Sequence, residues 1–455
     1  MARLHDGTEI ADRVADVDPV EADFDELPPL GPKGLAHLKA EIAVDPHARC
    51  AVCSAVDAKV SDEELDAAIL DAEAALARPD DAAEEIGRRW GKPVDTLPDF
   101  TFPGRDPVAI PINHRARKFE TRADLLGWLL WTAPGIVGQR VASRRSRARF
   151  RWHDAGRFVY PLPAPPITVA LFGDFGTGYY HALHIAKQIA AARPAAAIHL
   201  GDTYYAGRRA EIEAYLARPF RPMLADVPLW LLVGNHELYS GGHAWLRFLD
   251  EKRAASPATQ AQVGTYFCLR AAGCQIVAAE TEWWGRGSLG PPRLRAWLAD
   301  RLREGRADGL ANVLLTSYHP YTYGREGPSP LSRDTRELVG LVDLWAWGNT
   351  HYAALFDRSE AYPFVGVCLG HAGYPFDRTS PGGSEPAPLR WLETGTRFPE
   401  ETGIRPDRGL NGYAMLDLGP DGPATLRFVD WMGRTRRVAD LRRTPDGIKI
   451  VSVRS

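Results

Sequence analysis

The sequence predicts an α/β protein preceded by a mostly helical amino-terminal region, and three observations support this fold class. From about residue 160, short apolar runs alternate with longer helical segments, an order typical of α/β folds. Polar residues directly follow five of six apolar runs, as they do where ligand-binding loops leave strand ends. Charge also divides the chain, because residues 1–100 carry 24 acidic and 10 basic residues whereas residues 101–160 carry 4 and 12. We therefore expect two units, a helical region at 1–155 and a catalytic domain at 160–455.

The helical region contains three expected helices, at 61–77, 80–90 and 125–131. Ser61 and Glu64 have capping-box spacing and precede an Ala/Leu-rich run. The most apolar stretch, 125–138, is too short to span a bilayer and contains an internal proline. The arginines from Arg140 to Arg151 follow it. Together these features fit either a weak contact with an anionic membrane surface or a solvated helix packed on the catalytic domain.

The second unit begins after a Pro-rich segment at 161–166. Six strands are expected there, at 167–175, 195–202, 228–237, 273–281, 312–319 and 341–351. Helices are expected at 180–193, at 211–224 with a break at Pro219, and at 292–303. The tail at 412–437 has the pattern of a β-hairpin.

Composition excludes several classes of protein. The 455 residues are 45% apolar and 25% charged, so the chain is not a disordered or fibrous one. The formal net charge of −3 gives no basis for nucleic-acid binding. Five cysteines do not form a disulfide framework, and the first ten residues lack the apolar core of a signal peptide. We therefore expect a cytoplasmic protein.

Residue types that commonly bind metal ions stand at the ends of five of the expected strands. They stand in the blocks Gly173-Asp174-Phe175-Gly176, Gly201-Asp202-Thr203-Tyr204-Tyr205, Gly234-Asn235-His236-Glu237, Tyr318-His319-Pro320 and Gly348-Asn349-Thr350-His351. Carboxylate, amide, phenolate and imidazole groups are ligands for hard and borderline metal ions. Because ligands bind at the carboxyl ends of strands in α/β sheets, the five blocks are expected to meet at one metal site.

In their order and spacing, these blocks resemble the calcineurin-like metallophosphoesterases, and within them the purple acid phosphatase type, over residues 167–371. The resemblance implies a four-layer αββα sandwich and one or two divalent or trivalent metal ions, of iron, zinc or manganese. It assigns the first metal to Asp174, Asp202, Tyr205 and His351.

The resemblance gives further residues a role at the second metal and the substrate. Asp202 would bridge both metals and Asn235 would bind the second one. His236 would hydrogen-bond the phosphate or protonate the leaving group, and Glu237 would orient His236.

The sequence departs from the family pattern at the second metal. Asn349 stands where the pattern has a histidine. The fifth strand places Tyr318 in the usual ligand position and His319 beside it, so either residue is a candidate. An amide is a weaker ligand than imidazole for zinc-like ions. We therefore expect a robust first metal, and a second one that is weak, exchangeable or absent and held in part by His319 and Asn349.

These residues predict a phosphohydrolase that cleaves a phosphate monoester or diester through a metal-bound hydroxide. Its partner would be a small-molecule phosphate ester, with His243, His371 and Tyr318 as candidate substrate contacts. The altered second site leaves two alternatives, a binding or regulatory module and a mononuclear iron enzyme with non-phosphate chemistry.

Overall fold

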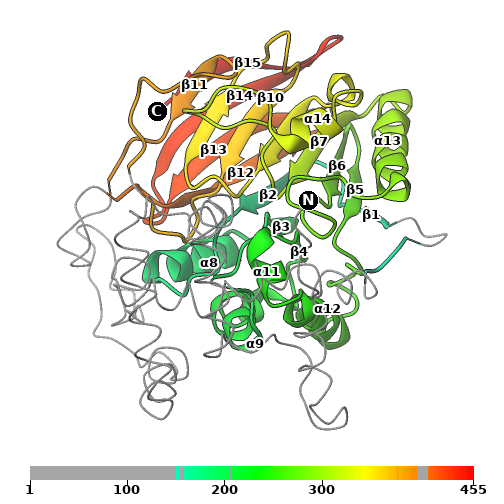
Figure 1. Cartoon of the computed structure of the whole chain (residues 1–455), viewed down its shortest axis with the longest axis vertical. Coiled ribbons are helices and arrows are strands. Elements are labelled where there is room, and N and C mark those ends of the chain that lie inside the picture. Colours follow the sequence, from blue (N-terminus) through cyan, green and yellow to red (C-terminus); the bar gives the residue numbers. More distant parts are fainter. Residues whose placement is uncertain (1–149, 154–157, 205, 377, 397–407) are drawn as a thin grey trace, which may run out of the picture.

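The computed structural model describes residues 150–153, 158–204, 206–376, 378–396 and 408–455 (Figure 1). The three helices expected before residue 150 and the arginines up to Arg149 lie outside these ranges. Arg151 is described and forms an ion pair with Asp250, with 2.6 Å between Nη2 and Oδ2, so it is engaged within the chain. In the described ranges, no helix has the length and apolar character that crossing a membrane requires.

Two β-sheets form the centre of the fold. The first sheet has the order β15-β14-β13-β12-β2-β3-β4. Its parallel part comprises β2 (Ile167–Phe172), β3 (Ala196–His199) and β4 (Leu229–Leu231). Its antiparallel part comprises β12 (Gly412–Gly419), β13 (Gly422–Asp430), β14 (Thr435–Thr444) and β15 (Gly447–Arg454). The expected carboxyl-terminal hairpin is β12 and β13, and it continues into two further strands that the sequence analysis missed.

The second sheet has the order β1-β5-β6-β7-β8-β10-β9-β11. Four consecutive strands of this sheet run parallel to one another, namely β6 (Cys274–Ala279), β7 (Ala311–Thr316), β8 (Leu344–Trp347) and β10 (Val365–Leu369). The remaining strands are β1 (Val159–Pro161), β5 (Phe267–Ala271), β9 (Ala353–Phe356) and β11 (Leu389–Leu392).

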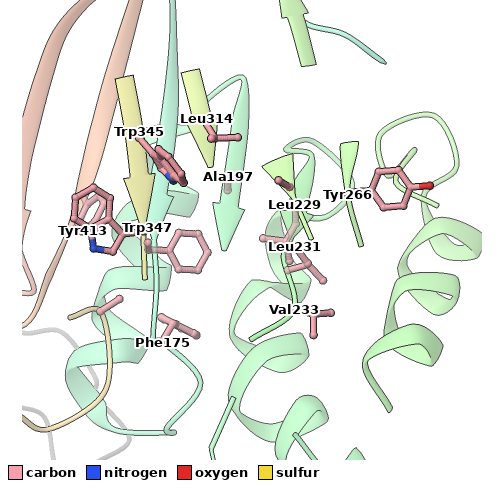
Figure 2. Packing of buried hydrophobic residues seen from close by; sticks show 14 of the residues in the cluster. Phe175, Ala197, Leu229, Leu231, Val233, Tyr266, Leu314, Trp345, Trp347 and Tyr413 are labelled. Carbon is pink, nitrogen blue, oxygen red and sulfur yellow. The ribbon is translucent and has the colours of Figure 1, made fainter. Parts of the chain in front are cut away.

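The alternation of side chains along each strand creates two separate cores. On β2, Val169 and Leu171 belong to a buried cluster that includes apolar residues from both sheets, so this cluster fills the space between them. Phe172, on the opposite face of β2, belongs to a second cluster that includes helix residues. Figure 2 shows members of this second cluster, among them Leu314 of β7 and Trp345 of β8.

Helices cover the outer faces of both sheets (Figure 1). Helices α8 (Tyr180–Ala192), α11 (Asn235–Tyr239) and α12 (His243–Ala255) lie beside β2, β3 and β4. Helix α13 (Pro292–Ala307) packs on β6 and β7 of the second sheet. Two short helices, α14 (Pro330–Asp334) and the 3-10 helix η3 (Val339–Leu341), precede β8. The layers therefore follow the order αββα, which confirms the predicted sandwich.

Helical backbone continues through the expected break at Pro219. The segment comprises α9 (Arg209–Glu211), the π-helix η1 (Ile212–Ala217), α10 (Arg218–Phe220) and the 3-10 helix η2 (Arg221–Met223). A proline has no N–H to donate, and a change of helix type around it adapts the hydrogen-bond pattern without ending the segment.

Hydrogen bonds join the carboxyl ends of strands from the two sheets. The N–H of Gly173, after β2, donates to the carbonyl of Leu369 at the end of β10, at 3.1 Å. The N–H of Asp174 donates to the carbonyl of Gly201, after β3, at 3.0 Å. The polar loops of both sheets therefore meet at one edge of the sandwich, as the sequence predicts.

Candidate metal centre

Three donor atoms from three different loops lie together at this edge. The Tyr204 hydroxyl donates a hydrogen bond of 2.7 Å to Asp174 Oδ1. His351 Nε2 lies 3.1 Å from the same carboxylate oxygen and 3.0 Å from the Tyr204 hydroxyl. Neighbouring ligands of an octahedral ion with bonds of roughly 2.1 Å lie about 3 Å apart. The triangle formed by Asp174 Oδ1, the Tyr204 hydroxyl and His351 Nε2 therefore has distances that suit both mutual hydrogen bonds and three ligands of one cation.

The tyrosine in this triangle is the neighbour of the one that the sequence analysis selected. Tyr205 lies outside the described residues, so its role as a metal ligand stays a prediction. Tyr204 is fully buried, and its ring packs on Tyr374 with 4.7 Å between centroids. Tyr374 also packs on His351 at 4.0 Å. Sequence reasoning missed both Tyr204 and Tyr374, although the adjacent tyrosines in the GDTYY block signalled that either could face the site.

Backbone strain concentrates at the same place. Asp174, Asp202 and Asn349 have φ values of 56°, 75° and 64°, in the left-handed region. Aspartate and asparagine tolerate this conformation better than most residues with a side chain. Non-glycine residues held there are found preferentially at functional sites, and these three lie on the loops of the candidate site. Their roles as ligands stay predictions.

Asp202 lies buried where the loops after β3 and β4 meet. Its Oδ1 accepts a 3.0 Å hydrogen bond from the backbone N–H of His236. A Cβ at Gly234 would overlap that same oxygen, so the close approach requires glycine. Burial, together with the nearby charges of Asp174 and Glu237, raises the pKa of Asp202 well above its usual range. A cation beside this carboxylate would offset both effects.

The other two carboxylates respond differently to burial. Burial alone would raise the pKa of Asp174, but hydrogen bonds from His351, Tyr204 and the backbone N–H of Asn349 outweigh it and lower that pKa. Burial raises the pKa of Glu237 to about 7, even though the carboxylate accepts backbone hydrogen bonds. The donors are the N–H groups of Gly234 and Asp202, at 2.8 and 3.1 Å. Glu237 thus ties the two loops together, while its predicted effect on His236 stays a prediction.

Asn235 and His236 begin helix α11 directly after the turn at Gly234. The Asn235 amide donates to the Tyr239 hydroxyl at 2.8 Å. Its buried Oδ1 has no hydrogen-bond partner within the part of the chain that the structure describes. Buried polar atoms are rarely left without a partner, so this oxygen fits a metal ligand. The His236 ring lies between Tyr204 and Tyr239, with centroid distances of 4.3 and 5.0 Å.

The residues expected at the weaker second position contact one another. Asn349 Nδ2 lies 3.3 Å from His319 Nδ1, and its Oδ1 accepts a long 3.4 Å hydrogen bond from Arg286. Burial, with the charges of Arg286 and Arg325, lowers the pKa of His319 to about 3. The Tyr318 ring stacks on His319 with 4.2 Å between centroids. The Asn349 amide is thus already engaged by two side chains.

The two remaining substrate candidates lie at different distances from the solvent. His243 is half-buried at the start of α12. His371 follows β10 and is buried, and burial lowers the pKa of its ring to about 4. The carbonyl of His371 accepts hydrogen bonds of 2.9 Å from the Asn411 amide and 3.1 Å from the Gly412 N–H. These contacts fix the chain beside β12, and a substrate role for either histidine stays a prediction.

A metal ion at this edge would need ligands other than His, Cys, Asp and Glu side chains, such as a tyrosine hydroxyl. In the described ranges, no three His, Cys, Asp or Glu side chains form a group that could hold a metal ion. The set that lies together combines Asp174 and His351 with the Tyr204 hydroxyl. Asp202 and Asn235, on the loops after β3 and β4, stay predicted ligands. Such a mixed set suits hard and borderline cations.

Comparison with known proteins shows which family the central part of the chain resembles. Residues 167–353 match the sequence profile of the calcineurin-like phosphoesterase family. This segment of the chain is similar to the calcineurin-like phosphoesterase domain. No curated protein matches the sequence.

Several solved structures are similar to the chain. A purple acid phosphatase from yellow lupin (Lupinus luteus) seeds is 15% identical, with 61% of this chain and 53% of the lupin chain covered and a TM-score of 0.46. The chain thus spans about half the length of the lupin enzyme. GAP50, the anchor in the inner membrane complex of Plasmodium, is 14% identical, with 63% and 89% covered and a TM-score of 0.44. A dimetal phosphatase from Danio rerio is 11% identical, with 58% and 96% covered and a TM-score of 0.38.

Proposed function

We propose that this chain is a metal-dependent phosphohydrolase that cleaves a small-molecule phosphate ester at the shared edge of its two sheets. One observation carries the proposal. Asp174 Oδ1, the Tyr204 hydroxyl and His351 Nε2 come from three separate loops, and each lies within 3.1 Å of the other two. The match of residues 167–353 to the calcineurin-like phosphoesterase family supports a phosphate ester as the substrate.

The metal would be held first by Asp174, Tyr204 and His351, with Asp202 beside them. When bound, a metal ion acts as a Lewis acid on a phosphoryl oxygen and lowers the pKa of a coordinated water. The protein's part is to hold the ligand loops in place. The left-handed turns at Asp174 and Asp202 and the close approach of Gly234 to Asp202 do this.

His236 is the proposed proton donor to the leaving group. Its backbone N–H is fixed on Asp202 Oδ1 at 3.0 Å, and its ring is held between Tyr204 and Tyr239. An imidazole positioned in this way transfers a proton without a large rearrangement, which is what general acid catalysis requires. Glu237 supports the arrangement by joining the loops on either side of His236.

We further propose that one ion binds tightly and that the second position is weak. Asp202 and Asn235 are still available there, and the Asn235 amide oxygen has no hydrogen-bond partner in the described ranges. The Asn349 amide, in contrast, is engaged by His319 and Arg286. A cation at the second position would compete with those contacts for its ligand.

The test is hydrolysis of an aryl phosphate monoester and an aryl phosphate diester by the full chain, with and without added Mn²⁺, Zn²⁺ or iron. We expect hydrolysis that needs metal and is lost in Asp202→Asn and in His236→Gln. Asp446→Asn is the matched control, since this carboxylate lies on the surface and pairs only with Lys449 in the described contacts. Full activity in either site variant, or activity without metal, would contradict the proposal. Metal binding without hydrolysis of any ester would favour the binding-module alternative.

A further inference from the structure

The loop after β6 places a guanidinium group beside Asn349, at the edge of the sandwich that carries the candidate metal centre. Strand β6 is parallel to β7, so its carboxyl end lies at the same edge as Tyr318 and His319. Arg286 follows in this loop between Gly285 and Gly287, which have φ values of 141° and 69°. A Cβ at Gly287 would come within 2.7 Å of the Tyr318 ring. The two glycines therefore let the loop pack closely against the edge that carries the site.

The contacts of Arg286 lead directly to the first-metal carboxylate. Its Nη2 donates to Asn349 Oδ1 at 3.4 Å, and its Cζ lies 5.9 Å from the centre of the Tyr318 ring. The backbone N–H of Asn349 in turn donates to Asp174 Oδ2 at 2.8 Å. Asn349 therefore contacts both Arg286 and Asp174, and the Arg286 side chain is exposed to solvent.

A buried acidic residue lies at the base of the same loop. Glu282 is 4% exposed, and its Oε1 has no hydrogen-bond partner in the described ranges. Burial raises the pKa of Glu282, and the charge of Arg286 acts on that pKa in the opposite direction.

We infer that Arg286 binds the phosphoryl group of the substrate, on the side of the site where Asn349 replaces a metal-binding histidine. A guanidinium is permanently charged and offers a planar set of donors that matches two phosphate oxygens. It supplies there a positive charge that a weakly held second metal does not supply reliably. This inference rests on the proposed function, because it concerns the substrate of that reaction.

The experiment compares the wild-type chain with Arg286→Gln and Arg286→Lys. Arg303→Gln is the matched control, because Arg303 is an exposed arginine on α13 that pairs with Asp300 at 3.8 Å. For each protein we measure kcat and KM for an aryl phosphate monoester, the Ki of inorganic phosphate as a competitive inhibitor, and the metal content. Losing a hydrogen bond from a charged donor weakens binding by roughly tenfold or more.

We expect Arg286→Gln to raise both KM and the phosphate Ki at least tenfold, with unchanged metal content and thermal stability. Arg286→Lys should recover part of the loss, and Arg303→Gln should behave as the wild type. A wild-type KM and Ki in Arg286→Gln would overturn the inference while hydrolysis by the wild type still stands. A loss of metal or of stability that accounts for the whole effect would also overturn it. If the wild type does not hydrolyse the ester, the proposed function fails, and direct calorimetric binding of inorganic phosphate then decides on Arg286 in the same way.

Discussion

Replacing Tyr204 by phenylalanine removes a single hydroxyl group from the centre of the site. That hydroxyl donates to Asp174 Oδ1 at 2.7 Å and lies 3.0 Å from His351 Nε2. Tyr204 and Asp174 are both 0% exposed, so water does not replace the lost donor. A hydrogen bond to a charged group contributes about 1.5–3 kcal/mol. We therefore expect Tyr204→Phe to lower the free energy of unfolding of the metal-free protein by about 2 kcal/mol.

The assay is urea unfolding of the metal-free wild type and variant, followed by the same measurement with metal added. A ligand that binds only the folded state stabilises it, by about 2.7 kcal/mol at a hundredfold excess over Kd. Because Tyr204 is a proposed ligand, Tyr204→Phe should also reduce this gain. Tyr413→Phe is the matched control, since its hydroxyl donates to Gln188 at 3.2 Å and not to a proposed metal ligand. It should leave the gain from metal unchanged.

Iron loading separates Tyr204 from its neighbour Tyr205. A tyrosinate bound to ferric iron gives a visible absorption band, and we expect Tyr204→Phe to lose it and Tyr205→Phe to keep it. The opposite result would show that Tyr205, the tyrosine predicted from the sequence, is the iron ligand.

The unfolding experiment has its own contradicting result. If Tyr204→Phe changes the free energy of unfolding of the metal-free protein by less than about 0.5 kcal/mol, the hydrogen-bond argument is wrong.

Three further predictions test the surroundings of the site. Burial lowers the pKa of His199 from 6.5 to about 3, so the folded protein loses stability as the pH falls below 6.5. His199→Phe removes this loss. From pH 7 to pH 5, its free energy of unfolding in urea should therefore rise by about 2 kcal/mol relative to that of the wild type. In Gly234→Ala the new methyl group would overlap Asp202 Oδ1, so calorimetry should show weakened metal binding, whereas Gly340→Ala, with open space around it, should bind metal normally. Leu314→Ala should cost about 2–5 kcal/mol of stability, because it opens a cavity in a fully buried core.

Each of these three predictions has a result that would contradict it. Equal pH dependence in the wild type and His199→Phe would show that His199 is not held neutral in the folded protein. Unchanged metal affinity in Gly234→Ala would mean that Asp202 does not need its observed position. A loss below about 1 kcal/mol in Leu314→Ala would mean that the second core is not close-packed around β7.

The sequence predicted the architecture well because its signals were local and periodic. Each of the six expected strands has a counterpart in β2, β3, β4, β6, β7 and β8, and the order of layers is as expected. Strands β1, β5, β9, β10, β11, β14 and β15 were not predicted. In β14, charged residues such as Arg442 and Arg443 interrupt the alternation. The expected strand at 228–237 also included residues that begin helix α11 at Asn235, so its end was predicted wrongly. Glu237, three residues after Gly234, was the available sign of a helix start, and its carboxylate does accept the Gly234 N–H.

The meeting of the polar loops at one edge could be predicted from the sequence, while the contacts within the candidate site depend on packing that sequence spacing does not encode. The roles of the site residues stay predictions. Asp174 and His351 meet as expected, because both follow parallel strands that end at one edge. Which of two adjacent tyrosines faces Asp174 depends on the turn after β3, where Thr203 pairs with Gly176, and spacing alone does not fix that turn. Arg286 belongs to none of the recognised blocks, although the sequence places it in the loop 280–290, a candidate for substrate selectivity. The position of its guanidinium 5.9 Å from the centre of the Tyr318 ring comes from the structure alone.

Calorimetric titration of metal into the metal-free full chain tests most directly whether these loops form a metal centre. We predict one tightly bound ion per chain in the wild type, a second that is weaker or absent, and no tight binding in Asp174→Asn. Failure of the wild type to bind Mn²⁺, Zn²⁺ or iron, or tight binding that persists in Asp174→Asn, would contradict this prediction.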